Sequence, residues 1–414
     1  MSFRLGLASR LAPFLLAEVV QRGLGLLLLA LLLHWLTADE FARYGLFTTA
    51  LSLGYLLLTF TLPAAPIRLL FDRKTAEQRA ELLVTIAVAT MVLAALVGSI
   101  AILVSAFVVD PLTGGSLRLK LLVLAAIMSL AFHQLVATVL RAQGKGKLMV
   151  AVAVAYGGLQ ISSFAVLHVL GIDDIEAITL ATSSALLAGA VVGLRGFGEF
   201  LLLVPPTRET LHEALDFAAP QVLHGVSLWG VSASGAWLGT LYFALEELAP
   251  YILLSLLVQV VAGVSSALFY ARTPELGVAF AELDLRSARR TLRTSLWQAS
   301  LLVITAYALA AVVFRSSIVP VPPGYALTTS MLLCGLVANL FHVWYLRGYS
   351  QLSFLKRTGR QSLGTVIAGA GTVGLILLLA PALGGLGLAM ALALGNFLQA
   401  GASNSLAAWS ERGL

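Results

Sequence analysis

Long apolar runs recur at short intervals along the whole chain. Each run approaches or exceeds the roughly 20 residues that a helix needs to cross a bilayer. The runs lack period-2 alternation and are longer than the strands of outer-membrane barrels, so helices are the only spanning element that satisfies their backbone polar groups. We therefore predict about 12 membrane spans, at residues 11–36, 41–67, 82–109, 119–140, 148–171, 177–194, 215–241, 250–270, 292–314, 326–347, 363–381 and 384–408.

Composition favours a membrane domain over a soluble one. Of the 414 residues, 59% are hydrophobic and 11% are charged, against roughly 25% charged residues in soluble domains. The formal charge of +6 could suggest a nucleic-acid partner, but the basic residues lie in short clusters between apolar runs. The first run carries Glu18 and Arg22 and precedes no small-residue cleavage site, so we interpret it as a span and not as a signal peptide.

The distribution of Lys and Arg predicts the orientation of the chain. With a cytoplasmic N-terminus, 21 of the 26 basic residues fall on the cytoplasmic side, Arg22 lies within a span, and four fall outside, namely Arg43, Arg118, Lys120 and Arg315. This asymmetry satisfies the positive-inside rule and places both termini in the cytoplasm. The cytoplasmic connection 271–291 carries apolar residues among charges, and we expect an amphipathic helix on the membrane surface there.

The two halves of the chain share a weak internal repeat. An offset of 207 residues lays Ala12-Pro13 on Ala219-Pro220, and ten of the 35 positions from Ala12 to Leu46 are identical. Chance similarity between apolar helices is the alternative explanation. Because each half holds an even number of predicted spans, the copies share one orientation. We therefore predict an all-α polytopic membrane protein with two pseudo-symmetric six-helix lobes, 1–205 and 206–414, and a substrate path between them.

Ionisable side chains inside a span are candidate functional groups, because each costs roughly 2.5–3.5 kcal/mol at a helix centre. Glu18 and Arg22 lie four residues apart on one face of the first span. One interpretation is a mutually neutralising pair that only permits insertion. The other is a cavity lining in which Arg22 binds a phosphate group, Glu18 holds the guanidinium or accepts a proton, and Gln21 widens the polar face.

Further candidates for substrate binding are polar side chains within spans and arginines at cytoplasmic helix ends. The first group has hydrogen bonding between helices as its alternative role, and comprises His133, Gln134, His224, Gln259 and Asn339. For the second group, the alternative role is snorkelling, in which a long side chain extends along apolar surface so that its charged end reaches water. Its members Arg68, Arg141 and Arg347 could instead form a basic mouth for an anionic headgroup, since guanidinium binds phosphate in bidentate fashion.

Sequence signatures of common enzymes are missing. The chain has no GxxxxGK[ST], HExxH, CxxC or GxSxG pattern, so we expect no catalysis, no cofactor and no metal site. A membrane polysaccharide polymerase or ligase is the enzyme alternative. Such enzymes typically carry a long periplasmic loop, whereas the longest outer loop predicted here runs only from Arg315 to Tyr325.

The predicted outer turn Leu36–Leu46 resembles the turn between spans 1 and 2 of Wzx-type oligosaccharide flippases, members of the multidrug/oligosaccharidyl-lipid/polysaccharide (MOP) exporter superfamily. Leu245–Tyr251, Leu140–Lys145 and Thr273–Leu276 resemble other turns of that family, although Pro250 stands where the family commonly has glycine. In the family's span 7, an Asp-Arg pair is common where this chain has Ser234-Gly235.

The resemblance implies a flippase that moves undecaprenyl-diphosphate-linked glycans across the bacterial inner membrane for surface polysaccharide synthesis by alternating access. The expected partners are this polyprenyl-diphosphate-linked oligosaccharide, the lipid bilayer and polysaccharide-assembly membrane proteins, with no nucleic acid. Drug-exporting relatives carry an acidic residue in span 1, so Glu18 leaves open a cation-coupled exporter of small amphiphiles or drugs, of the same superfamily or of the major facilitator type.

Overall fold

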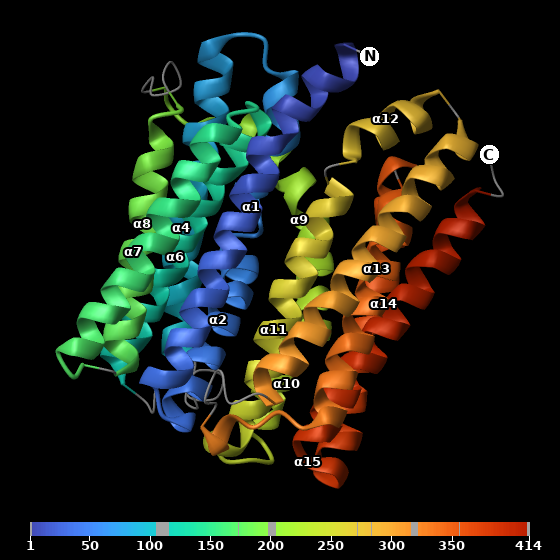
Figure 1. Cartoon of the computed structure of the whole chain (residues 1–414). Helices are drawn as coiled ribbons and strands as arrows, with labels where there is room; N and C mark the ends of the chain where they lie inside the picture. Colours follow the sequence, from blue (N-terminus) through green and yellow to red (C-terminus); the bar gives the residue numbers. More distant parts are fainter. Residues whose placement is uncertain are drawn as a thin grey trace. The chain divides into compact units, whose positions relative to one another are not determined.

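The computed structural model describes residues 2–104, 116–172, 174–197, 204–270, 272–282, 284–315, 322–355 and 357–411. All regular secondary structure in these ranges is helical (Figure 1). Contacts divide the chain into two compact units. Unit 1 comprises Met1–Leu29 and Leu46–Val222, and unit 2 comprises Ala30–Gly45 and Leu223–Leu414. Two helices, α1 (Ser2–Trp35) and α9 (Arg208–Ser232), contribute one part to each unit.

Unit 1 is built around three neighbouring helices, α6, α7 and α8 (Figure 1). Two of them begin at a side-chain cap: Ser116 Oγ accepts a hydrogen bond from the Leu119 amide at 3.3 Å, and Asp174 Oδ1 accepts one from the Ala177 amide at 2.7 Å. The helices of this unit, besides the parts of α1 and α9, are most of α2 (Ala38–Leu58), η1 (Leu62–Ala64), α3 (Pro66–Leu69), η2 (Leu70–Asp72), α4 (Ala76–Val104), α6 (Leu117–Ala142), α7 (Gly146–Val169) and α8 (Ile175–Leu194).

The core of unit 1 lies where the C-terminal half of α6 meets its neighbours. Val136, Val139 and Leu140 have no exposed surface, and they pack with Met149 and Ala190. This close packing places the end of α6, including Arg141, against the helices that surround it.

Unit 2 contains the later helices and the turn between α1 and α2. Its longest helical stretch, α15, is interrupted at Gly384, whose φ of 64° is left-handed and favours glycine, so the stretch comprises two helices joined by a kink. The helices of unit 2 are α10 (Ser234–Gly239), α11 (Leu245–Tyr270), α12 (Thr273–Ala281), α13 (Leu285–Arg315), η4 (Pro323–Tyr325), α14 (Thr329–Phe354) and α15 (Thr358–Glu411).

The turn between α1 and α2 packs against later parts of unit 2. The Tyr325 hydroxyl donates a 2.5 Å hydrogen bond to the Leu36 carbonyl, and the Tyr325 and Phe41 rings meet edge-on at 5.2 Å between centroids. A Cβ atom on Gly45 would lie 2.2 Å from Ile252, so glycine permits this approach of α2 to α11. Contacts therefore group residues 30–45 with unit 2, while the predicted lobes 1–205 and 206–414 stay a prediction.

Ten helices in the described residues are long and apolar enough to cross a membrane. One of them, Gly359–Glu411, covers two predicted spans, whereas α9, which carries four charged residues before Phe217, is not among the ten. The protein is thus an all-α polytopic membrane protein, and the count of 12 and the side of the termini stay predictions.

Two predicted spans differ from the helices observed. The helix predicted for residues 41–67 ends at Leu58, because Phe60 and Thr61 adopt left-handed φ values of 49° and 53°. The span predicted for 215–241 is broken at Ala233, between α9 and α10.

The helix expected in the connection 271–291 is present as α12, but its apolar side is covered by protein. Leu276 is 1% exposed, and the Phe280 ring stacks on Phe354 with centroids 5.4 Å apart. The apolar residues of this connection on which the expectation rests also include Leu283 and Ala288. Of these, Ala288 belongs to the following helix, α13, and Leu283 lies outside the described residues.

Candidate functional site

Glu18 pairs with an arginine from a distant part of the sequence. Its Oε1 atom lies 3.1 Å from Nη2 of Arg141, at the end of α6, and the side chains are 28% and 40% exposed respectively. Of the two interpretations given above, the neutralising pair of Glu18 with Arg22 is not among the described ion pairs. The packing of unit 1 brings in a partner 123 residues away, which helical spacing alone could not indicate.

Arg22 lies one turn beyond Glu18 on α1 and keeps an unsatisfied group. Its Nε atom is buried and has no hydrogen-bond acceptor among the described residues. A buried donor without an acceptor is uncommon and calls for a partner such as water or a ligand. Two guanidinium groups, on Arg22 and Arg141, thus accompany one carboxylate and leave an excess positive charge. Gln21, adjacent on α1, is half-buried.

His133 has a packing role within unit 1. It is 6% exposed, its Nδ1 atom lies 3.2 Å from the Leu186 carbonyl oxygen, and its ring lies 5.3 Å from that of Tyr156. These contacts join α6 to α8 and α7, as expected for a polar residue that connects helices in a membrane. Gln134, the next residue, is half-buried.

A polar network that the sequence analysis missed fastens the start of α9 to α4. Glu81 accepts hydrogen bonds from the hydroxyls of Thr207 and Thr210, at 2.5 and 2.7 Å. Arg73 forms an ion pair with Glu213 beside it. These partners are separated by more than 100 residues and share no motif, so no sequence signal could have found them.

The predicted site residues of unit 2 lie in separate small networks. His224 Nδ1 lies 3.1 Å from Thr365 Oγ1, and its ring stacks on Tyr349 with centroids 5.9 Å apart. The completely buried Asn339 donates a 2.9 Å hydrogen bond from Nδ2 to the Tyr307 hydroxyl, and its buried Oδ1 has no partner among the described residues.

The other two predicted residues of this unit do not join those networks through any described hydrogen bond. Gln259 donates a 3.4 Å hydrogen bond to Ser255 on its own helix, and Arg347 is half-buried on α14.

The structure therefore gathers only part of the predicted set. In unit 1 it brings together Glu18 and Arg141, with Arg22 one turn away on α1. The side chain of Arg68 lies outside the described residues. In the described part of the chain, no group of three or more His, Cys, Asp or Glu is placed to hold a metal ion.

This chain resembles known proteins in its fold. No family model matches the sequence, and no curated protein matches it either. Among solved structures, an inward-facing multidrug resistance MATE family transporter of the MOP superfamily matches with a TM-score of 0.68, at 14% identity, over 95% of this chain and 97% of that one. The chain has the MOP transporter fold.

Two other MOP-fold matches differ in their described roles. The lipid II flippase MurJ, in an inward closed conformation, gives a TM-score of 0.67 at 12% identity, over 94% of this chain and 86% of that one. A MOP superfamily transporter from Pyrococcus furiosus, described as having a binding pocket of reversed polarity, gives 0.59 at 15% identity, over 98% and 95% of the two chains. These matches are transporters and not enzymes.

Proposed function

We propose that this chain is a MOP transporter that flips polyprenyl-diphosphate-linked oligosaccharides across the bacterial inner membrane, for surface polysaccharide synthesis. In this proposal 12 spans form two six-helix lobes and both termini lie in the cytoplasm. The observation that carries it is the group of Arg22, Arg141 and Glu18 on the apolar helices α1 and α6. The MOP fold shared with a lipid II flippase supports it further.

The chemistry of the group suits a diphosphate headgroup. Guanidinium forms paired, charge-assisted hydrogen bonds with phosphate oxygens. The unsatisfied Nε of Arg22 supplies a donor, and the half-exposed Arg141 can exchange its bond to Glu18 for one to the ligand. The headgroup and sugars then cross between two lobes that open alternately to each side, while the lipid tail stays in the bilayer.

The proposal is tested with purified protein in proteoliposomes that contain a fluorescent polyprenyl-diphosphate oligosaccharide. We expect Arg22→Ala and Arg141→Ala each to lower the flipping rate at least ~10-fold, since a charge-assisted hydrogen bond contributes about 1.5–3 kcal/mol. Arg208→Ala, an exposed arginine elsewhere in unit 1, is the control and should leave the rate unchanged. Wild-type flipping by both well-inserted site variants contradicts the assigned site.

A cation-coupled exporter of small amphiphiles is the second candidate, and the acidic residue of α1 favours it. Glu18 is 28% exposed and forms an ion pair with Arg141. Protonation of the Glu18 carboxylate would break this ion pair. A pH gradient should then drive efflux of a lipophilic cation, and Glu18→Gln should abolish that efflux. Flipping of the lipid-linked sugar without such efflux separates the first candidate from the second.

A further inference from the structure

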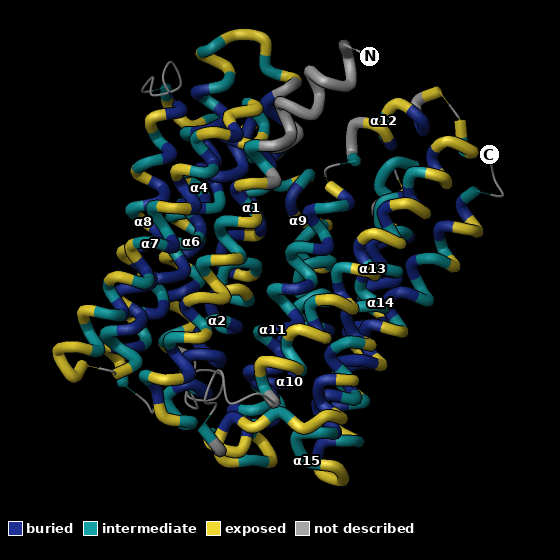
Figure 2. Tube along the Cα trace, viewed as in Figure 1, coloured by how far each residue is buried: buried dark blue, intermediate teal, exposed yellow. Residues whose placement is uncertain are grey.

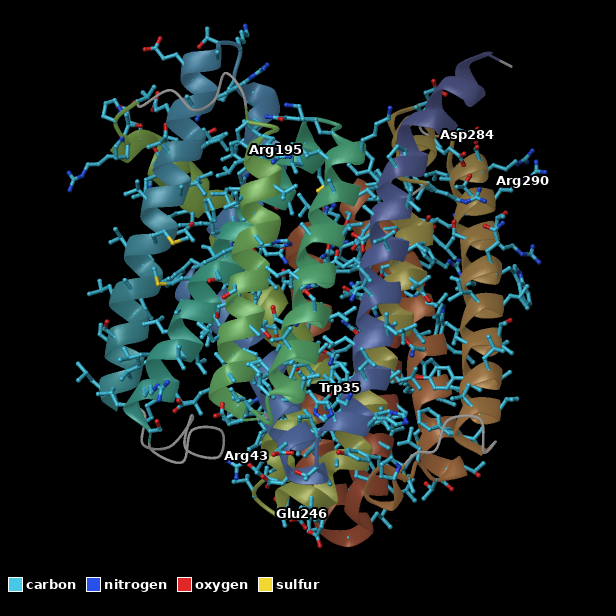
Figure 3. The ribbon with its side chains drawn as sticks, turned by 60° about the vertical axis from the view of Figure 1, so that its left-hand side comes forward. Trp35, Arg43, Arg195, Glu246, Asp284 and Arg290 are labelled. Carbon is cyan, nitrogen blue, oxygen red and sulfur yellow. The ribbon has the colours of Figure 1, made fainter. Side chains whose placement is uncertain are left out.

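The exposed face of α13 begins with a row of arginines. Arg286, Arg290 and Arg293 are exposed, and their spacing places them on one side of the helix. Figure 3 shows Arg290 pointing away from the helices of its unit. Trp297 follows on the same side, one turn after Arg293, and is 67% exposed.

Beyond Trp297 the same face becomes apolar. Leu301, Ile304 and Val312 are 67%, 50% and 60% exposed, and Figure 2 shows that exposed positions recur along α13. From Trp297 to Val312 the helix rises roughly 22 Å, a large part of the roughly 30 Å hydrocarbon core of a bilayer. A shallow, open groove of about 480 Å³ lies on the flank of this face, and its lining residues all belong to α13: Gln298, Leu301, Leu302, Thr305, Ala306 and Leu309.

The orientation of α13 about its own axis is fixed by the packing of the side opposite the arginines. Ala288, Leu292 and Ala299 are at most 1% exposed, so these positions pack inside unit 2. The arginines and the apolar residues that follow them are therefore held outward by the packing of the helix.

The charge on this face is not matched within the described part of the chain. Arg289, on the flank of the row, forms a 2.9 Å ion pair with Glu411. No described carboxylate forms an ion pair with Arg286, Arg290 or Arg293. Asp284, just before the helix, accepts a 3.0 Å hydrogen bond from the Ser287 amide as its N-terminal cap.

We propose that this face of α13 is a binding site for an acidic phospholipid. The arginines contact the phosphate-bearing headgroup, Trp297 lies at the boundary between headgroups and hydrocarbon, as tryptophan commonly does, and an acyl chain lies along the groove. Basic residues near a membrane surface attract acidic lipids electrostatically, and several on one face act together. The proposal does not depend on which cargo the protein transports.

A second copy of the chain fits this face less well. A symmetric pair of copies joined through α13 would bring two rows of like charge together, and like-charge contacts across an interface are unfavourable. Acidic lipids supply the opposite charge and cover the apolar part of the face at the same time.

The test measures quenching of Trp297 fluorescence by lipids brominated on their acyl chains. The full chain is placed in phosphatidylcholine vesicles that contain a minor fraction of either brominated phosphatidylglycerol or brominated phosphatidylcholine. Subtracting the signal of Trp297→Phe isolates the emission of this one tryptophan. We expect the acidic lipid to quench it at least ~3-fold more efficiently, as its attraction to several arginines predicts.

In the double variant Arg290→Gln/Arg293→Gln, brominated phosphatidylglycerol and brominated phosphatidylcholine should quench Trp297 equally within experimental error. The matched control Arg208→Gln/Arg357→Gln removes the same charge at other exposed arginines and should keep the preference. Equal quenching by both lipids in the unchanged chain overturns the proposal, as does a preference that survives in the first double variant. Absence of quenching by either lipid also overturns it, because protein then covers the face.

Discussion

Glu18 is a carboxylate on a helix that is otherwise suited to the hydrocarbon of a bilayer. Its only described ionic partner is Arg141, on a different helix of unit 1. A charge in such surroundings is costly alone and much less costly when paired. Removing either partner therefore has two consequences: the bond is lost, and the remaining charge has no counterion.

This reasoning predicts measurable coupling between Glu18 and Arg141. Arg141→Gln should lower the thermal stability of the purified protein, and adding Glu18→Gln should recover part of that loss. A double-mutant cycle should give a coupling energy of about 0.5–1 kcal/mol, at the low end of values for interacting pairs because both side chains are partly exposed.

The pair of Arg118 with Glu176 provides the comparison. Its atoms lie 3.0 Å apart, but Arg118 is 81% exposed, so its coupling should be smaller, about 0.2–0.5 kcal/mol. If the coupling energy of Glu18 and Arg141 is no larger than that of Arg118 and Glu176, the surroundings of Glu18 do not strengthen its ion pair beyond an ordinary surface pair.

At the scale of elements, the turn between α1 and α2 is held by a side chain from the short helix η4. Burial, reinforced by the nearby Glu40 carboxylate, raises the pKa of Tyr325 to about 12, from its ordinary value near 10. The hydroxyl thus stays protonated at physiological pH and keeps donating to the Leu36 carbonyl.

Tyr325→Phe should loosen this turn without disturbing the rest of unit 2. We expect faster amide hydrogen exchange in residues 30–45 and a stability loss of about 0.5–1.5 kcal/mol, the usual net contribution of one hydrogen bond. Tyr242→Phe, at a 40% exposed tyrosine, is the control. Unchanged exchange in residues 30–45 would refute a role for this hydrogen bond.

The pKa of Tyr325 also gives a pH dependence. A pKa that is raised on folding contributes stability that is complete below pH 10 and is lost as the pH rises to about 12. In Tyr325→Phe, the decline of stability over this window should be shallower than in the unchanged chain.

Another contact within unit 2 bears on the predicted repeat. Gly45 and Ile252 are separated by the same 207 residues that relate the two halves of the sequence, and they touch where α2 meets α11. The contact is described within unit 2, and the repeat itself stays a prediction.

At the scale of the whole molecule, the orientation of the chain can be tested directly. Figure 3 shows Glu246 at one end of the helices of unit 2, and Asp284 and Arg290 at the other. Cys334 is the only cysteine, so Cys334→Ser gives a background without thiols. A cysteine introduced at Glu246 should react with an impermeant maleimide added to intact spheroplasts, and one at Ser287 only after permeabilisation. The reverse pattern contradicts the predicted orientation.

The helical character of the chain could be predicted because each helix satisfies its backbone within one segment, whereas the predicted count of 12 spans stays a prediction. Breaks within segments were harder to predict. The left-handed residues Phe60 and Thr61 carry no typical breaker signal, and the predicted helix accordingly runs past the observed end at Leu58. Of the candidate site, the sequence grouped Glu18 with Arg22 and named Arg141 separately, among the arginines at cytoplasmic helix ends.

By itself, the sequence determined that this protein is an all-α membrane protein. Apolar runs of sufficient length form helices through local hydrogen bonds, and their apolar side chains favour the hydrocarbon of a bilayer over water. Only the tertiary structure decided which charges meet. Glu18 could choose between an arginine four residues away and one 123 residues away, and helix packing selected Arg141. Pairing between distant residues depends on how helices approach one another, and the spacing of residues within one helix does not contain that information.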